Sequence, residues 1–299
     1  MNEKKKCPNC GLLIDEDLEK CPYCGFNIKE HEEKVVTEIK EEQLEAKKEE
    51  TKIKPRWLVF AERRDVAISK EVSLFLMLIL GLTIISLLFQ FITAIINPYF
   101  LNSVAGSAMM NFSIYFVAFG VCLLILNKDV VKVFFKYKER RTWIYGIAYG
   151  FFLIIASALY NAFSSAIFGN VGSNNNENAI DTIIGSFPVL SVIVFSFIGP
   201  ICEELGYRLG LFSFLRRYNR VLAYIVAAVI FGFIHFDFTT FGNSDALKVE
   251  LINIPSYVIS GLILCYVYDK EGLETSILAH VTNNFIAVLM TIISTFATK

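Results

Sequence analysis

The sequence predicts an all-α polytopic membrane protein with about seven transmembrane helices, preceded by a small separate domain. Hydrophobic residues make up 55% of the 299 residues, and the mean hydropathy of +0.51 is too high for an ordinary globular protein. Most apolar residues gather in runs long enough to cross about 30 Å of hydrocarbon as helices. Charged residues concentrate instead in residues 1–70 and in short loops. Between six and eight spans are compatible with this pattern.

Four cysteines define the N-terminal domain. Residues 7–11 read CPNCG and residues 21–25 read CPYCG, so two CxxC pairs lie close together. Each pair can aim two thiolates at one tetrahedral ion, and the glycine that follows allows a tight bend. A segment of this length buries too little apolar surface to fold alone. Metal ligation would therefore supply its folding energy. We predict a cytoplasmic zinc ribbon at residues 1–28, with structural zinc held by Cys7, Cys10, Cys21 and Cys24.

Two disulfides or a redox-active CxxC are the alternatives for these cysteines, and both are disfavoured because the motif is duplicated and its flank has cytoplasmic character. The ribbon would recruit a protein partner or a substrate, and nucleic acid is an unlikely partner despite the basic run at residues 4–6. A charged linker follows at residues 29–65, where Glu-to-Lys spacings favour a solvated helix. No cleavable signal peptide is expected, because no apolar stretch follows the basic start.

The membrane domain is predicted at residues 66–299. Its candidate spans are apolar runs separated by polar or basic loops, and the short second and fifth runs are also compatible with re-entrant segments. The candidate spans are Ser73–Asn97, Asn111–Leu126, Trp143–Phe168, Pro188–Gly206, Val221–Phe236, Leu251–Tyr268 and Ser276–Phe296.

Loop charges orient these spans. Residues 127–142 contain six Lys or Arg and residues 208–220 contain four, whereas residues 97–110 and 169–187 contain none. By the positive-inside rule the N-terminus and both basic loops face the cytoplasm. The predicted location is therefore the cell membrane, with the Asn-rich residues 169–187 as an outer loop.

The first polar motif inside an apolar run is EExxxR, which begins at Glu203. On a helix Glu204 and Arg208 are four residues apart and can pair, whereas Glu203 is rotated by about 100° and can remain free as a base. Ionised side chains in hydrocarbon cost several kcal/mol unless they are paired or hydrated, so this carboxylate pair is a candidate functional site. The alternative is a cytoplasmic helix end at which Glu204 and Arg208 only reach the interface.

Two of the three histidines also lie in apolar runs. His235 follows Phe231 by four residues in FGFIH, and His280 precedes Asn284 by four residues in HVTNN. An imidazole and a carboxamide on one helical face can donate together to an oxyanion or hold a water. A histidine in such a helix otherwise serves as an interhelical hydrogen-bond partner. Because three runs each carry polar groups, we predict that these groups share one site.

The ordered motifs EExxxR, FxxxH and HxxxN resemble the CPBP family of intramembrane endopeptidases. This family includes type II CAAX prenyl proteases and the bacterial Abi proteins linked to bacteriocin processing or immunity. The likeness covers about Trp143 to Phe296. It implies that the first Glu and the first His activate water, and that the later His and the Asn stabilise the oxyanion. The matched residues are Glu203, Glu204, Arg208, Phe231, His235, His280 and Asn284.

The family is commonly described as metalloproteases, but this sequence has no HExxH motif. A catalytic zinc would have to draw Glu203, His235 and His280 from three helices. General-base catalysis by Glu203 needs no metal and is the favoured of the two mechanisms.

The function predicted is hydrolysis of a peptide bond of a membrane-associated or amphipathic substrate, in a cavity open to the cytoplasm. The alternative is a non-catalytic membrane scaffold or bacteriocin-immunity protein in which the polar groups only pack. A solute transporter would be expected to show internal repeats, and none is seen. One difficulty remains, because His235 would lie about 20 Å deeper than Glu203 if its helix began at Val221 and ran straight.

Overall fold

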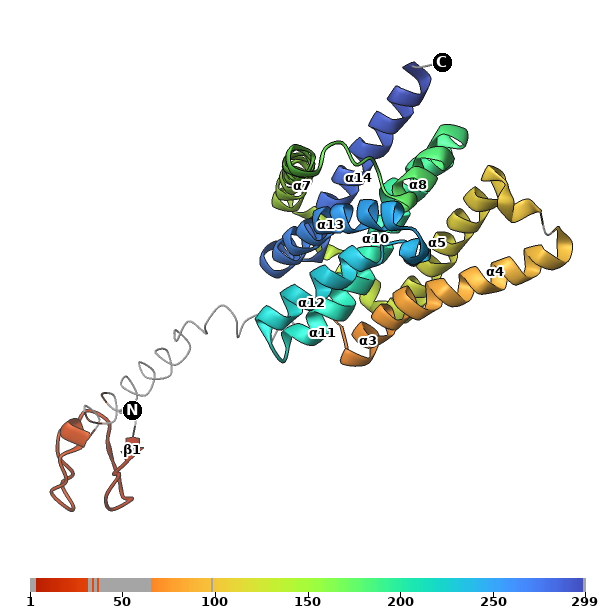
Figure 1. Cartoon of the computed structure of the whole chain (residues 1–299). Helices are drawn as coiled ribbons and strands as arrows, with labels where there is room; N and C mark the ends of the chain where they lie inside the picture. Colours follow the sequence, from red (N-terminus) through yellow and green to blue (C-terminus); the bar gives the residue numbers. More distant parts are fainter. Residues whose placement is uncertain (1–3, 32–33, 35–36, 38–65, 98, 298–299) are drawn as a thin grey trace. The chain divides into compact units, whose positions relative to one another are not determined.

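The computed structural model describes residues 4–31, 34, 37, 66–97 and 99–297 (Figure 1). The chain divides into two compact units, Met1–Glu62 and Arg63–Lys299. Most of the linker predicted at residues 29–65 lies outside the described residues.

The first unit is built from two equivalent turns beside a two-stranded sheet. Strands β1 (Lys4–Lys6) and β2 (Leu13–Asp15) pair antiparallel. Gly11 and Gly25 have φ angles of 74° and 73°, a conformation that glycine adopts without a steric penalty. The N–H of each glycine donates at 2.9 Å to the carbonyl of the cysteine four residues earlier, which closes the turn. The small core of the unit consists of Cys7, Ile14, Cys21 and Ile28.

The second unit is a bundle of long apolar helices (Figure 1). Among the described residues, six helical segments are long and apolar enough to cross a membrane. This confirms the predicted fold class, and six lies within the predicted range of spans. The segments are Ile68–Ile96, Val104–Val133, Arg140–Phe168, Pro188–Arg216, Ser244–Glu271 and Leu273–Ala297.

Several of these segments contain more than one type of helix. The α-helices are α3 (Ile68–Leu76), α4 (Leu82–Ile96), α5 (Val104–Leu126), α6 (Val130–Val133), α7 (Arg140–Phe168), α8 (Asn175–Ser186), α9 (Pro188–Ser191), α10 (Gly199–Glu203), α11 (Ser213–Arg216), α12 (Arg220–Phe233), α13 (Ser244–Glu271) and α14 (Leu273–Ala297). The π-helical segments are η1 (Met77–Gly81), η5 (Val192–Ile198) and η6 (Glu204–Phe212). The 3₁₀ turns are η2 (Phe100–Asn102), η3 (Asn127–Asp129), η4 (Phe135–Lys138) and η7 (Phe238–Gly242).

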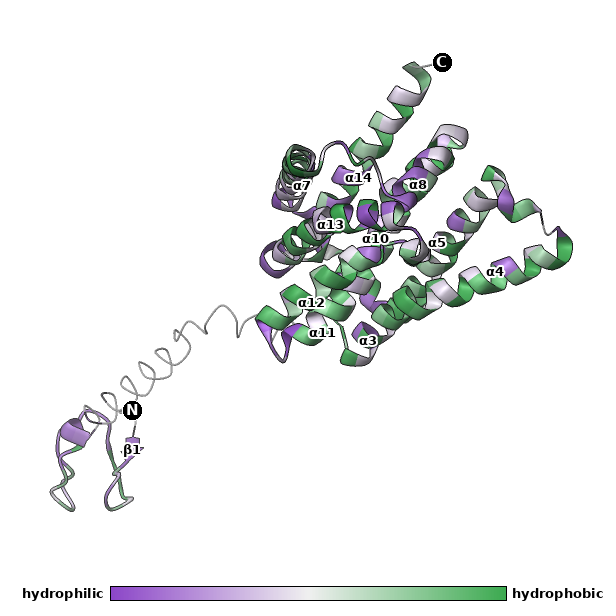
Figure 2. Cartoon of the chain, viewed as in Figure 1, coloured by the Kyte–Doolittle hydropathy of each residue, from purple (hydrophilic) through white to green (hydrophobic). Residues whose placement is uncertain are grey.

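The helices of the bundle consist of hydrophobic residues over long stretches (Figure 2). On α4, for example, Leu88, Phe91 and Ile95 are all exposed. Such a continuous apolar surface is unfavourable in water but matches the hydrocarbon of a bilayer. The helices therefore form a multi-pass membrane protein.

The fourth span is longer than predicted. It ends at Arg216 instead of Gly206, and Glu203 therefore lies 13 residues, or about 20 Å, from its end. Helix α12 has 14 residues, so His235, just beyond it, also lies about 20 Å from the start of α12. The two side chains thus reach similar depths. The expectation that Glu203 lies near the end of its span was wrong, because the charged residues that follow it are buried within the helix.

Residues 169–187 are not simply the predicted loop, because they contain helix α8. The Asn174 side-chain oxygen accepts a hydrogen bond from the Glu177 N–H at 2.8 Å and caps the helix. The Asn174 side-chain amide also donates to the Tyr257 hydroxyl at 3.3 Å. The Asn-rich stretch is therefore a helix N-terminus that is tied to α13.

Helix α7 approaches α14 closely beside the polar residues of α14. A Cβ at Gly150 would lie 2.4 Å from the Thr282 Cβ and 2.9 Å from the Ala279 carbonyl oxygen. Only glycine fits this contact without moving the helix. Gly150 therefore helps to set the position of His280, the next residue after Ala279.

Candidate active site

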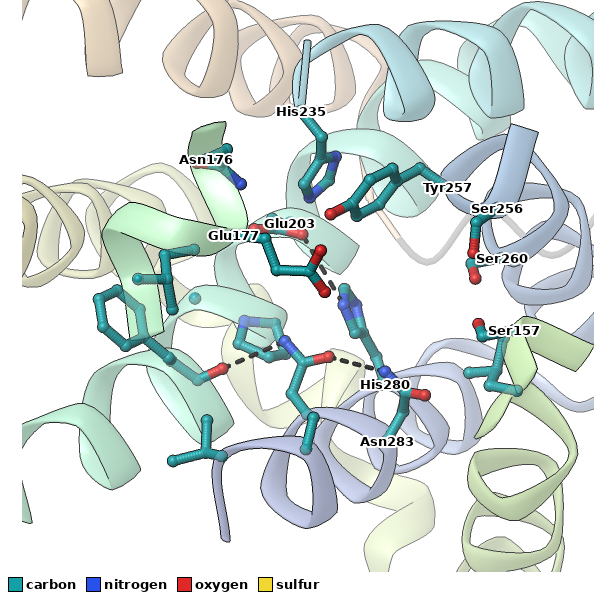
Figure 3. Close-up of a pocket in the computed structure, with 18 of the residues that line it drawn as sticks. Ser157, Asn176, Glu177, Glu203, His235, Ser256, Tyr257, Ser260, His280 and Asn283 are labelled. Atoms are coloured by element: carbon teal, nitrogen blue, oxygen red, sulfur yellow. Dashed lines mark hydrogen bonds and ion pairs between the residues drawn. The ribbon is translucent and has the colours of Figure 1, made fainter. Parts of the chain in front are cut away.

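Four of the predicted site residues line one cavity of about 600 Å³. Glu203 comes from α10, His235 from the turn after α12, and His280 and Asn284 from α14. Figure 3 shows Glu203, His235 and His280 pointing into the same space. Three segments that are far apart in the sequence therefore place a carboxylate, two imidazoles and a carboxamide around one cavity.

Glu204 and Arg208 lie behind the cavity wall and do not line it. Their side chains are 0% and 1% exposed, and the Arg208 Nη1 lies 3.0 Å from the Glu204 Oε1. The guanidinium carbon of Arg208 also lies 4.4 Å from the centre of the Phe231 ring. Glu204 accepts further hydrogen bonds from the Ser276 hydroxyl and, at 2.9 Å, from the His280 Nδ1. This carboxylate therefore holds one cation and one histidine.

Glu203 differs from its neighbour because it has cavity space in front of it. Its side chain is 12% exposed. The Tyr115 hydroxyl donates to its Oε1 at 3.2 Å. Its Oε2 lies 3.8 Å from the His280 Nε2, so no group in the described part of the chain donates to this oxygen at hydrogen-bond distance. The arrangement leaves one carboxylate oxygen available to a water or substrate in the cavity.

The hydrogen-bond partners assign the tautomers of both histidines. A backbone carbonyl can only accept, so the His235 Nδ1, 2.9 Å from the Phe231 carbonyl oxygen, carries a hydrogen. That carbonyl lies in the last turn of α12, where carbonyls lack helical partners. The His235 Nε2 is therefore an acceptor in the neutral ring. By the same reasoning His280 donates from Nδ1 to Glu204, and its Nε2 faces Glu203.

Asn284 is held by its own neighbours. Its side-chain amide donates to the Phe195 carbonyl of η5 at 3.2 Å, and its oxygen accepts from the Asn283 amide at 3.0 Å. A carboxamide has two N–H groups, so one remains for a ligand in the cavity.

Several residues that support His235 were not predicted from the sequence. The Tyr257 ring stacks on the His235 ring with a centroid distance of 4.2 Å and an interplanar angle of 11°. Glu250, which is 1% exposed, accepts hydrogen bonds from the backbone N–H groups of Asn175 at 3.0 Å and Asp237 at 3.2 Å. Glu250 therefore ties α13 to the start of α8 and to the turn that carries His235. In the sequence, Glu250 could have been noticed only as a carboxylate that directly precedes an apolar run.

The ribbon cysteines fit a tetrahedral metal site. The Sγ atoms of Cys7 and Cys24 are 3.8 Å apart, and so are those of Cys10 and Cys21. Zn–S bonds of about 2.3 Å in tetrahedral geometry separate two sulfurs by about 3.8 Å, whereas a disulfide needs about 2.05 Å. The disulfide alternative is therefore not adopted.

The cavity residues do not form a comparable cluster. Within the described residues, the ribbon cysteines are the one group of three or more His, Cys, Asp or Glu whose ligand atoms all lie within 4.8 Å of one another. Glu203, His235 and His280 do not converge to that extent, and the Nδ1 atoms of both histidines are already engaged. This arrangement does not fit a three-ligand zinc site.

Comparison with family models identifies both parts of the chain. Residues 185–286 match the model described as type II CAAX prenyl endopeptidase Rce1-like, and this range includes all three polar motifs. The chain contains an Rce1-like domain. Residues 3–28 match a zinc-ribbon domain. The resemblance predicted from the motifs and the N-terminal ribbon are thereby confirmed.

Two curated proteins are similar to this chain. An uncharacterized protein of Mycoplasma capricolum is 27% identical over 183 residues, which are 57% of this chain and 51% of that protein. The chain thus matches about half the length of this relative. A Bacillus subtilis protein named "Putative membrane peptidase YdiL" is 26% identical over 215 residues, 70% of this chain and 82% of that protein. No solved structure gives a significant match. These findings support a membrane protease.

Proposed function

We propose that the chain is an intramembrane endopeptidase in which Glu203 and His235 activate the attacking water. The convergence of Glu203, His235, His280 and Asn284 on one cavity carries this proposal. If these polar side chains served packing alone, they would be expected to pair with one another, as the buried ions of Glu204 and Arg208 do. Glu203 instead presents an oxygen without a close donor to a cavity that can hold a peptide segment.

The proposed reaction begins with a water between the Glu203 carboxylate and the Nε2 of His235. Glu203 accepts a proton from the water as the water oxygen bonds to the carbonyl carbon of the scissile peptide. The negative charge that develops on the carbonyl oxygen is stabilised by the second N–H of Asn284 and by the Nε2–H of His280 when that ring is protonated. Glu203 then returns the proton to the leaving nitrogen as the C–N bond breaks. Tyr115 keeps the carboxylate oriented through its 3.2 Å hydrogen bond.

Glu204 and Arg208 act on this site through His280. The Glu204 carboxylate fixes the His280 ring by accepting from Nδ1, and Arg208 neutralises the buried charge. The two residues are positioning residues in this proposal, although the family motif groups them with Glu203.

Charge in the cavity indicates which peptide segments would bind. Glu177, Asp181 and Glu203 line it, and none of its lining residues in the described part of the chain is Lys or Arg. A neutral or cationic segment is therefore favoured over an acidic one. Desolvation raises the pKa of Glu177 and of Asp181, so their negative charge develops as the pH rises through these raised values. Preference for a basic peptide should strengthen in the same direction, and Glu177→Gln with Asp181→Asn should weaken it.

The N-terminal ribbon is proposed to hold one structural zinc ion and to recruit a protein partner or substrate. Its four sulfurs match the geometry of zinc thiolate sites. The basic strand β1 makes anionic lipid a weaker alternative partner.

The experiment for the enzyme is cleavage of membrane-inserted peptides by the reconstituted chain. His235→Ala should reduce turnover almost as much as loss of Glu203.

Whether catalysis depends on a metal is tested with a Cys7→Ser plus Cys10→Ser variant, which lacks the ribbon site. This variant should keep its cleavage activity after chelator treatment. Loss of its activity on chelation and recovery with added zinc would establish a catalytic metal instead. Full activity of His235→Ala would contradict the role of His235 in activating the water, and absence of cleavage by the wild-type chain would favour the scaffold or immunity protein.

A further inference from the structure

The cavity extends in one direction from the candidate catalytic groups. On three helices its lining residues advance toward the same end of the bundle, the end at which α8 lies (Figure 1). The lining runs from Leu153 to Asn161 on α7, from Leu264 to Asn253 on α13 and from His280 to Thr291 on α14. At that end Asn176 and Glu177 of α8 border the cavity, and both are labelled in Figure 3.

The opposite end of the site is closed by packed side chains. All nine residues of η6 (Glu204–Phe212) are buried, and none of them lines the cavity. Beyond them the hydroxyls of Ser213 and Tyr268, both buried, are hydrogen-bonded to each other at 2.5 Å. Ser276 is also buried and bonds to Glu204. A peptide therefore reaches Glu203 from the α8 end and not through η6.

The two ends of the bundle differ sharply in charge. At the closed end, residues 127–142 contain six Lys or Arg, and residues 213–220, which follow the buried η6, contain three. Residues 97–110 and 169–187, at the open end, contain none, and residues 237–250 contain one, Lys248. Helix α7 alone separates the first basic loop from α8 by 29 residues, or about 43 Å. The positive-inside rule therefore assigns the closed end to the cytoplasm.

Two of the predictions made from the sequence cannot both hold. A cytoplasmic position of the basic loops and a cavity open to the cytoplasm are incompatible, because the cavity opens away from those loops. The loop charges are the stronger evidence, since the difference of nine cations against one in these loops is large and has a known physical basis in membrane insertion.

We propose that the cavity opens on the extracytoplasmic side of the membrane and takes peptide segments presented there. The substrate class is then an exported peptide, or the extracytoplasmic part of a membrane-anchored chain beside its membrane segment. The side on which the cavity opens is inferred from the geometry and the loop charges. The substrate class additionally rests on the proposed endopeptidase function.

The test is labelling of single introduced cysteines in intact cells with a membrane-impermeant maleimide. Asn176→Cys reports the rim, and Ser157→Cys reports the interior of the cavity (Figure 3). Tyr137→Cys, in the basic loop, reports the opposite side, and Ser213→Cys reports the packed closed end. Of the native cysteines, Cys122, Cys202 and Cys265 are buried, and the ribbon cysteines would lie on the cytoplasmic side of the membrane.

The expected result is labelling of Asn176→Cys and, more slowly, of Ser157→Cys from outside. Tyr137→Cys should react only after permeabilisation. The labelling rate of Ser213→Cys should be at least tenfold lower than that of Ser157→Cys in intact cells and in permeabilised cells. Reaction of Ser157→Cys only after permeabilisation overturns the proposal. Labelling does not depend on proteolysis. If the cavity labels from outside and the wild-type chain cleaves no membrane-inserted peptide, the access route stands and the endopeptidase assignment fails; if Glu203→Gln cleaves normally, the assignment of Glu203 as the base fails.

Discussion

Replacement of Glu204 by Gln should destabilise the membrane domain more than the same change at Glu203. The Glu204 carboxylate is the charge partner of Arg208, at 3.0 Å, and both side chains are buried. The three guanidinium nitrogens of Arg208 have no geometrically good hydrogen bond to compensate for loss of that partner. A glutamine keeps the shape of Glu204 but leaves the Arg208 charge unbalanced among apolar side chains.

The expected size of this effect follows from the burial of the pair. Removal of one partner of a buried ion pair costs about 3–5 kcal/mol. For a domain of this size, each kcal/mol lowers Tm by about 2–4 °C, which gives a decrease on the order of 10 °C. Thermal unfolding in detergent measures it. A second variant, Glu204→Gln with Arg208→Met, removes both charges and should recover part of the loss.

Glu203→Gln is the matched control, because it removes the same charge from the adjacent residue. Among the described residues Glu203 pairs with no Lys or Arg; its Oε2 lies 3.8 Å from the His280 Nε2, and the side chain faces the cavity. Its replacement should therefore change Tm by only a few degrees. Equal Tm values for the two single variants would refute the assignment of Glu204 to the buried ion pair. A double variant less stable than Glu204→Gln would refute the charge-imbalance reasoning.

Three further predictions test other parts of the structure. Purified protein should contain one tightly held zinc ion per chain. A Cys7→Ser plus Cys10→Ser variant should lose this ion while the membrane domain stays folded. Disulfides between the ribbon cysteines, together with the absence of metal, would overturn the ribbon site. Asn284→Ala should lower kcat by about 10² to 10³ and leave substrate binding nearly unchanged, and an equal change in KM would argue for a binding role instead. Tyr257→Leu should lower kcat by about tenfold or more through misplacement of His235, whereas Tyr257→Phe, which keeps the stacked ring, should retain most of the activity.

The sequence was sufficient for the features that depend on local patterns. Runs of apolar residues predicted the helical bundle, and duplicated CxxC motifs predicted the ribbon turns that Gly11 and Gly25 close. Residues four apart on one helix, such as Glu204 and Arg208, are neighbours wherever the helix packs. Their ion pair is therefore close to a consequence of spacing alone.

Features that depend on packing between distant segments were missed. The hydropathy pattern predicted that the fourth span ends at Gly206, because charged residues lower hydropathy. In the structure the charged residues of η6, Glu204 and Arg208, are buried and the helix continues. Helix α8 was missed because Asn and Gly favour turns, whereas here Asn174 caps a helix. The contacts of Glu250 and Tyr257 with the turn around His235 join residues that no sequence period relates. The direction of the cavity follows from the same packing.

The central claim is that Glu203 is the base of an intramembrane endopeptidase. The most direct measurement is cleavage of a verified substrate by wild-type and Glu203→Gln protein in proteoliposomes, with substrate binding and Tm measured on the same preparations. The structure predicts that Glu203→Gln binds substrate and unfolds much as the wild type does, because this side chain faces the cavity and has no close cationic partner. It should show no detectable turnover. Wild-type cleavage by a folded Glu203→Gln protein would contradict the claim, because the cleavage would then not depend on Glu203.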